Sequence, residues 1–109
     1  MAVEPDLSKF QPLDHETLTV SNVAVPLTIA KASLAFLAEI VCETDQMRFW
    51  KDASNPTTAQ GILVGPGERV YLWAVEIIGF RAIRVTGDAT LQVTYYVRRT
   101  GLRPDQPVV

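Results

Sequence analysis

The clearest alternation of apolar and polar side chains runs from residue 89 to residue 98. One set is mainly apolar and the other polar: Ala89, Leu91, Val93, Tyr95 and Val97 against Thr90, Gln92, Thr94, Tyr96 and Arg98. A period of two is typical of a strand with one buried and one solvent-exposed face. Thr86-Gly87-Asp88 precedes it and has the composition of a turn, with Gly87 free to adopt a positive φ. The pattern therefore predicts an antiparallel hairpin that joins this strand to residues 80–85.

Shorter apolar runs separated by turn residues predict further strands. We expect them at residues 17–20, 23–29, 34–43, 47–50, 61–64 and 68–73. The second run contains a proline, which is typical of an edge strand or a bulge. Residues 34–43 include good helix formers, but the alternation of Phe36, Ala38, Ile40 and Cys42 favours a strand.

Seven or eight short strands predict an all-β protein, a single antiparallel β-sandwich or barrel of jelly-roll type. Its expected core consists of Phe36, Ile40, Phe49, Val70, Leu72, Leu91, Val93 and Tyr95. Residues 1–16 contain two prolines, four acidic residues and no hydrophobic period, which predicts an extended N-terminal arm. Residues 98–109 contain two more prolines and predict a C-terminal tail. The β-sandwich body is therefore expected to span residues 17–97.

Composition narrows the classes of function. The chain has 109 residues, which is enough for one domain, and a formal net charge of −2 without any basic run, so we expect no nucleic-acid partner. Neither a signal peptide nor a membrane-spanning segment is visible, so we expect no membrane partner. Cys42 is the only cysteine and lies in an apolar run. This predicts a buried structural thiol in a protein made in the cytosol.

Candidate catalytic and metal-binding residues are few. His15 is the only histidine, and Asp14 and Glu16 are its neighbours in sequence rather than convergent ligands, so we expect no metal site. Glu39 and Glu43 lie four apart in a predicted strand and would be about 13 Å apart on one face. That separation exceeds the usual distance between paired glycosidase carboxylates. We therefore expect no enzyme, no catalytic residue and no cofactor.

Four aromatic residues fall on strand faces opposite the main apolar sets: Trp50, Tyr71, Trp73 and Tyr96. Aromatic rings in such positions either stack on a sugar or fill a protein contact. We favour coverage by an arm or a subunit contact.

The remaining candidate interaction residues are three arginines and two residues of the predicted arm: Arg81, Arg84, Arg98, Phe10 and Leu13. Guanidinium groups bind carboxylates through paired hydrogen bonds, so the arginines are candidates for gripping an acidic partner strand. The two arm residues are candidate apolar anchors for attachment.

Several short motifs occur in an order that resembles a known family. In chain order they are Cys42-Glu43-Thr44, Met47-Arg48-Phe49-Trp50, Asn55-Pro56-Thr57-Thr58, Phe80-Arg81-Ala82-Ile83 and Thr94-Tyr95-Tyr96. This order resembles a family of small virion structural proteins of tailed bacteriophages, over roughly residues 17–97. The usual family loop reads Asp-Gly-Thr-x-Pro-Thr, whereas Asp52-Ala53-Ser54 lacks the glycine and leaves its tight turn in question.

The resemblance implies a structural part of a virus particle, without catalytic residues. We expect a capsid decoration or cement protein, made in the host cytoplasm and located in the virion. It would bind the head shell as a homo-oligomer, a trimer more than a dimer, with the major capsid protein or other virion proteins as partners. The alternatives are a carbohydrate- or receptor-binding β-sandwich module and a component of the head–tail junction or portal.

Overall fold

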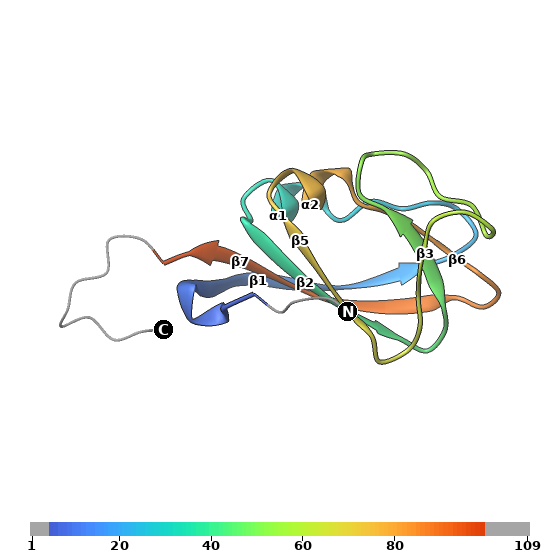
Figure 1. The fold of residues 1–109 in the computed structure, drawn as a ribbon, viewed down its shortest axis with the longest axis horizontal. Helices are drawn as coiled ribbons and strands as arrows, with labels where there is room; N and C mark the ends of the chain where they lie inside the picture. Colours follow the sequence, from blue (N-terminus) through green and yellow to red (C-terminus); the bar gives the residue numbers. More distant parts are fainter. Residues whose placement is uncertain (1–4, 100–109) are drawn as a thin grey trace.

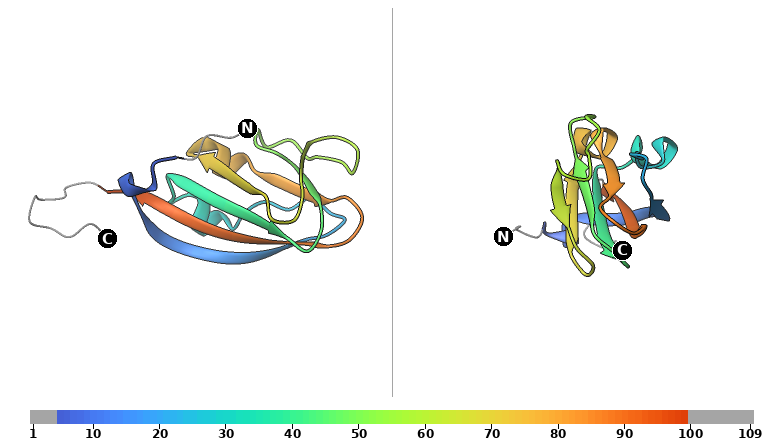
Figure 2. Two further views of the ribbon diagram at one scale, coloured as in Figure 1. Left: turned by 60° about the horizontal axis from the view of Figure 1, so that its bottom comes forward. Right: turned by 90° about the vertical axis from the view of Figure 1, so that its right-hand side faces the viewer.

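The computed structural model describes residues 5–99, and the predicted antiparallel β-sandwich is confirmed. Within that range the strands are β1 (Phe10–Val20), β2 (Leu37–Glu43), β3 (Met47–Trp50), β4 (Ile62–Val64), β5 (Arg69–Trp73), β6 (Arg81–Arg84) and β7 (Ala89–Arg98). One sheet has the strand order β1-β7-β2-β5 and the other the order β4-β3-β6, and all described pairings are antiparallel. Figures 1 and 2 show the long strands β1 and β7 side by side.

Short helical turns connect some of the strands: η1 (Leu7–Lys9), α1 (Ile29–Ala32) and α2 (Val75–Gly79). α1 and α2 lie next to each other beside the end of β5 (Figure 1). The strand expected over residues 23–29 is wrong, because only an isolated bridge between Val25 and Ala82 forms there. Pro26 follows that bridge and has no backbone N–H for a further ladder bond.

The hairpin predicted around residues 86–88 is also wrong in its pairing. β6 pairs with β3, whereas β7 lies between β1 and β2, so the turn carries the chain from one sheet to the other. The connections from β2 to β3 and from β4 to β5 cross between the sheets as well. Gly87 does not adopt a positive φ. A Cβ there would lie 2.5 Å from Oδ2 of Asp45, so the glycine leaves room for that carboxylate.

The main core fills the space between the two sheets. Six of the eight expected core residues are buried: Ile40, Phe49, Leu72, Leu91, Val93 and Tyr95. Val70 is half-buried and packs against this core. Phe36 is half-buried too and belongs to a different cluster described below. Cys42 is buried, as expected, and burial raises the pKa of its thiol, with smaller effects from nearby carboxylates.

The N-terminal arm predicted over residues 1–16 is wrong from Phe10 onward, because β1 is an integral strand. It pairs with β7 from Phe10 opposite Arg98 to Val20 opposite Ala89, with a register shift between Pro12 and Asp14. Proline is tolerated there because β1 is an edge strand and the ladder is interrupted at that point. The body therefore begins at residue 10 and ends with β7 at residue 98. Residues 1–4 and 100–109 of the two predicted arms lie outside the described residues.

The segment Asp52-Ala53-Ser54, whose tight turn the missing glycine left in question, bends at Ala53. Ala53 has a φ of 71°, a left-handed conformation that costs a non-glycine residue about 1–2 kcal/mol. Its amide donates a hydrogen bond to the carbonyl of Gly79 at 2.8 Å. A Cβ on Gly79 would lie 2.6 Å from the carbonyl oxygen of Lys51, so α2 packs directly on the turn. This contact holds Ala53 in a conformation that glycine would adopt freely.

Candidate functional site

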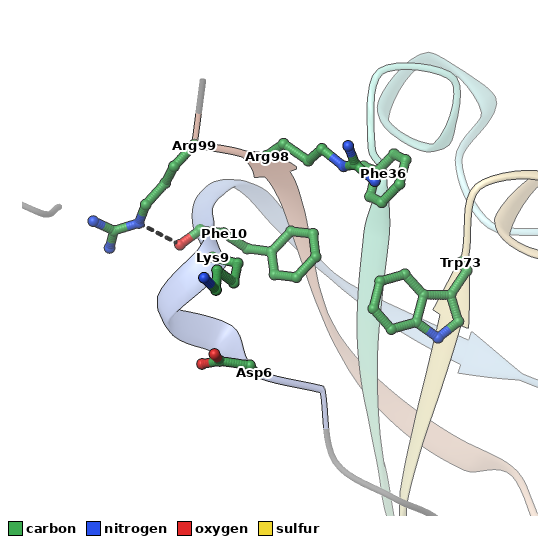
Figure 3. A pocket seen from close by; sticks show the side chains of 7 residues that line it. All are labelled: Asp6, Lys9, Phe10, Phe36, Trp73, Arg98 and Arg99. Carbon is green, nitrogen blue, oxygen red and sulfur yellow. Dashed lines mark hydrogen bonds between the residues drawn. The ribbon is translucent and has the colours of Figure 1, made fainter. Parts of the chain in front are cut away.

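An aromatic cluster lies at one end of the four-stranded sheet. Phe10 begins β1, Phe36 comes directly before β2, and Trp73 ends β5, so the strand order brings the three rings together. Their centroids are 5.6 to 6.1 Å apart, with Phe10 and Phe36 stacked and Trp73 edge-on to both. These are favourable arrangements for aromatic pairs. Figure 3 shows the ring of Phe10 reaching toward those of Phe36 and Trp73.

This cluster is separate from the core between the sheets. Phe10 is only 7% exposed and Leu37 is fully buried, yet neither belongs to the main core cluster. Trp73 pairs with Leu37 in register across β2 and β5 and remains 40% exposed. The sheet therefore carries a second, small apolar cluster whose indole side is open to solvent.

The cluster forms the floor of a pocket of about 510 Å³, which we call the aromatic pocket. It is lined by Asp6, Lys9, Phe10, Phe36, Trp73, Arg98 and Arg99 (Figure 3). The guanidinium of Arg98 lies 4.2 Å from the ring centroid of Phe36, within range for a cation–π contact. Arg99 donates through Nε to the carbonyl of Phe10 at 2.9 Å. This bond ties the end of β7 to the start of β1.

Positive charge prevails among the residues that line the aromatic pocket. Three cationic side chains face one carboxylate, that of Asp6. Hydrogen bonds from the side chain and backbone of Ser8 hold the pKa of Asp6 below its ordinary value, with a smaller contribution from Lys9. Asp6 is therefore ionised near neutral pH, and one of its oxygens already caps η1. Across residues 5–99, none of the three cations forms an ion pair.

The structure brings together three of the predicted interaction residues: Phe10, Trp73 and Arg98. Sequence reasoning missed Phe36, Lys9 and Arg99 as members of the same site. Phe36 follows the alternation of β2, which pointed to the main core instead. The pair Arg98-Arg99 at the end of a strand was a usable signal for a cationic site.

The other predicted aromatic residues lie elsewhere. Trp50 is in β3 of the second sheet, opposite Arg81 of β6. Tyr71 lies in β5 and donates a hydrogen bond to Glu39 at 3.2 Å. Trp50, Tyr71 and Trp73 therefore do not form one continuous platform.

The remaining predicted residues are dispersed as well. Arg81 donates to the carbonyl oxygens of Ile78 and Phe80 at 3.1 and 2.8 Å. Arg84 forms an ion pair with Asp88 at the opposite end of β7 from the aromatic pocket. Leu13 is 44% exposed on β1.

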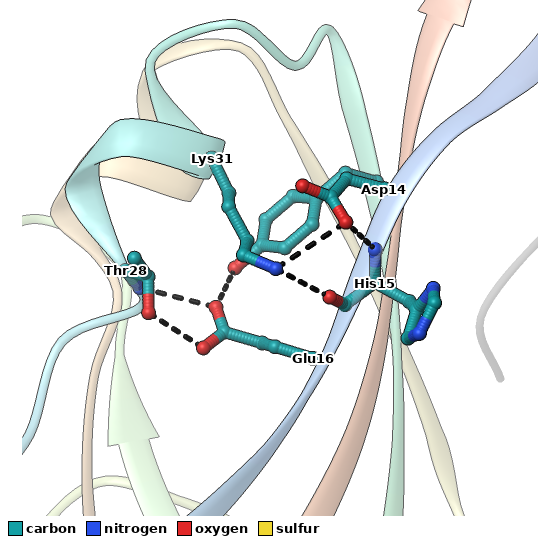
Figure 4. Close-up of polar contacts among 6 residues, drawn as sticks. Asp14, His15, Glu16, Thr28 and Lys31 are labelled. Atoms are coloured by element: carbon teal, nitrogen blue, oxygen red, sulfur yellow. Dashed lines mark hydrogen bonds and ion pairs between the residues drawn. The ribbon is translucent and has the colours of Figure 1, made fainter.

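A polar network joins β1 to α1 on the inner side of the edge strand. Glu16 accepts hydrogen bonds from the backbone N and Oγ1 of Thr28, at 3.1 and 2.6 Å, and from the hydroxyl of Tyr95. Lys31 contacts Asp14 at 3.3 Å and the carbonyl of residue 15 at 2.7 Å (Figure 4). Burial raises the pKa of Tyr95, and the adjoining Glu16 carboxylate raises it further, so the phenol remains a donor. The network anchors α1 to the sheet.

We expect Glu16 to make stability dependent on pH. Burial raises its pKa, but the hydrogen bonds from Thr28 and Tyr95 outweigh burial and leave the pKa below its ordinary value of 4.5. Its contribution is therefore complete above about pH 4.5 and is lost as the pH falls through the lowered pKa. The difference in unfolding free energy between wild type and Glu16→Gln should be largest at pH 7 and shrink below pH 4.5, measured by urea unfolding. Asp14 is present in both proteins, so its own pH dependence cancels in this difference. A difference in unfolding free energy that does not change with pH would show that Glu16 is not the group responsible.

A second exposed surface lies over α1 and α2. A pocket of about 440 Å³ is lined in part by Ile29 of α1 and Ile78 of α2. Their side chains are 63% and 41% exposed. Leu34 lies two residues after the end of α1 and is 68% exposed, and Val75 in α2 is 81% exposed. A backbone bond from Ala74 to Phe36 joins the neighbouring segments. We call these four side chains the helical surface.

Among residues 5–99, no group of three or more histidine, cysteine, aspartate or glutamate side chains is placed to hold a metal ion. None of the helices described there is long and apolar enough to cross a membrane.

Comparisons of the chain with protein-family models, with curated proteins and with solved structures found no match.

Proposed function

We propose that the protein is a structural component of a bacteriophage virion, a capsid decoration protein that binds the head shell as an oligomer. The order of short motifs between β2 and β7 supports this proposal, and an all-β sandwich is compatible with it. The observation that carries it is the helical surface. Four large aliphatic side chains are exposed in α1, in the turn after it and in α2, and the two helices contact each other. Exposed apolar patches mark contacts with other proteins.

The helical surface has the chemistry of a lasting contact rather than of a catalytic site. Burying one exposed Val, Leu or Ile side chain contributes roughly 1.5–3 kcal/mol before the costs of association. Four such side chains are enough to hold a small protein on a repeating shell, where several copies bind at once. The partner is the major capsid protein, a neighbouring copy of this chain in a trimer, or both.

The direct test is the number of copies in purified particles of the phage that encodes the chain. Hundreds of copies are expected for a shell protein. A dozen or fewer would instead indicate the portal or tail, and absence from the particles would contradict the proposal.

The helical surface can be tested with the double variant Ile29→Glu/Ile78→Glu. Both side chains are exposed, so we expect the thermal midpoint to stay close to that of the wild type, while binding to particles that lack the protein falls at least about tenfold. The matched control is Val23→Glu, because Val23 is 65% exposed but lies outside the helical surface. Particle binding that the double variant retains would rule out this surface as the attachment site.

A glycan-binding module is the second candidate, and one observation favours it: the indole of Trp73 is exposed beside two other rings. Glycan binding that Trp73→Ala abolishes, in a protein that does not associate with particles, would establish this function instead. Trp50→Ala is the matched control, because Trp50 lies in the other sheet.

A further inference from the structure

We infer that the aromatic pocket binds an acidic peptide segment of a partner protein. In this arrangement carboxylates of the peptide contact Lys9, Arg98 and Arg99, and an adjacent apolar side chain packs on Phe10 and Trp73. The inference concerns a surface distinct from the helical surface, and it holds whether or not the protein is part of a virion.

Charge is the first argument. Three cations and one carboxylate line the aromatic pocket, and that carboxylate, Asp6, is already engaged by Ser8. Elsewhere in residues 5–99, Lys31, Lys51 and Arg84 form ion pairs with carboxylates. Arg48 and Arg81 donate to backbone carbonyls instead. The cations of the pocket lack a carboxylate partner within that range. A single additional carboxylate would meet complementary charge there.

An unsatisfied donor is the second argument. Within residues 5–99, Nη1 of Arg99 is the buried side-chain nitrogen or oxygen that has no hydrogen-bond partner. Buried polar groups are nearly always hydrogen-bonded, and an unsatisfied charged donor is costly. The Nε of the same guanidinium is fixed on the carbonyl of Phe10, which orients the group. An incoming carboxylate would supply the acceptor that the free donor lacks.

The aromatic rings in the pocket favour a peptide over a simple anion, because they offer a surface on which an apolar side chain can pack. Trp73 offers an exposed indole face, and the pocket volume of about 510 Å³ lies within the range of sites that hold small ligands. A neutral sugar would stack on the indole but leave the three cations without a counter-charge. A nucleic acid needs a run or stripe of basic residues along its backbone, and the chain has none. A carboxylate next to an apolar side chain satisfies both halves of the pocket.

The two tryptophans of the chain make a sharp experiment possible. Trp73 lies in the aromatic pocket and Trp50 lies in the other sheet. In the NMR spectrum of an isotope-labelled protein, the indole N–H signal of Trp73 therefore reports on the pocket, and that of Trp50 serves as an internal reference. The ligand is a terminally blocked peptide with two glutamates and two leucines separated by glycines. Its matched control has glutamine in place of each glutamate. Trp73→Phe assigns the two signals.

We expect the acidic peptide to shift the Trp73 signal saturably while the Trp50 signal stays in place. The glutamine peptide should bind at least about tenfold more weakly, and added salt should weaken the acidic peptide. The double variant Lys9→Gln/Arg98→Gln should lose affinity by a similar factor. Arg84→Gln removes a cation at the far end of β7 and should bind like the wild type.

Three results would overturn the inference. They are a Trp73 signal that does not respond to the acidic peptide, equal affinity for the two peptides, and equal affinity of the wild type and the Lys9→Gln/Arg98→Gln variant. A Trp73 response to neutral oligosaccharide but not to the acidic peptide would assign the pocket to glycans instead. Unchanged circular dichroism of the variants shows that a loss of affinity is not a loss of fold.

Discussion

Replacing Val93 with aspartate is expected to unfold the protein. Val93 is 1% exposed in the middle of β7, where it pairs with Ile40 on one side and Glu16 on the other. A buried carboxylate without a partner costs several kcal/mol, and a domain of this size is stable by only roughly 5–15 kcal/mol. The new carboxylate would also lie next to that of Glu16, which adds repulsion between like charges.

The matched control is Gln92→Asp, which places the same carboxylate one residue earlier on the exposed face of β7. We expect this control to melt cooperatively with a loss of about 1–2 kcal/mol, because it gives up exposed hydrogen bonds to Thr17 and Glu43 and places a second carboxylate near Glu43. Circular dichroism and thermal melting at pH 7 distinguish the two outcomes. A Val93→Asp protein that is soluble and melts cooperatively would show that the two faces of β7 are reversed.

The strands that alternate clearly were predictable, and their partners were not. β7 and β2 are each flanked by two strands, and their inward positions, such as Ile40 and Val93, are apolar by necessity. The pairing of β6 with β3 rather than β7 depends on contacts between segments about thirty residues apart. Local periodicity contains no information on such pairings, because a turn of the same composition can close a hairpin or cross a sandwich.

Only the end of β1, at residues 17–20, was predicted as a strand, because the inner face of its first part is polar. The inward positions Asp14 and Glu16 interact with Lys31 and Thr28 of the α1 segment instead of packing into the apolar core. This removes the alternation that identifies an edge strand. The polar partners lie 12 and 17 positions along the chain from these acids, so only the folded chain shows why acids occupy these places.

The aromatic pocket was predictable only in part, for the same reason. Trp73 and Arg98 stood out as residues on the outer face of their strands, and Phe10 as an apolar residue in a polar segment. Their convergence requires the strand order of the sheet, which places the starts of β1 and β2 beside the ends of β7 and β5. Arg99 is held at the pocket by its hydrogen bond to the carbonyl of Phe10, a contact that the sequence does not reveal.

Phe10→Ala is expected to lower the free energy of unfolding by about 3 kcal/mol, at the lower end of the range for large aromatic residues in a core. Phe10 is 7% exposed and contacts Phe36 and Trp73, so truncation leaves a cavity and removes two ring contacts. Because Phe10 is the first residue of β1, the cluster is what fastens the start of this edge strand to the sheet. If residues 1–16 formed a free arm, the same substitution would cost almost nothing.

Leu13→Ala provides the matched control for Phe10→Ala. Leu13 lies on the same strand but is 44% exposed, so its truncation should change the unfolding free energy by no more than about 0.5 kcal/mol. Urea unfolding followed by far-ultraviolet circular dichroism measures both values, and a common slope of free energy against urea shows that they are comparable. Equal losses for the two variants would mean that the aromatic cluster does not fasten β1. The start of the strand would then be held by its backbone ladder to β7 alone, and the aromatic pocket would lack the rigid floor that binding requires.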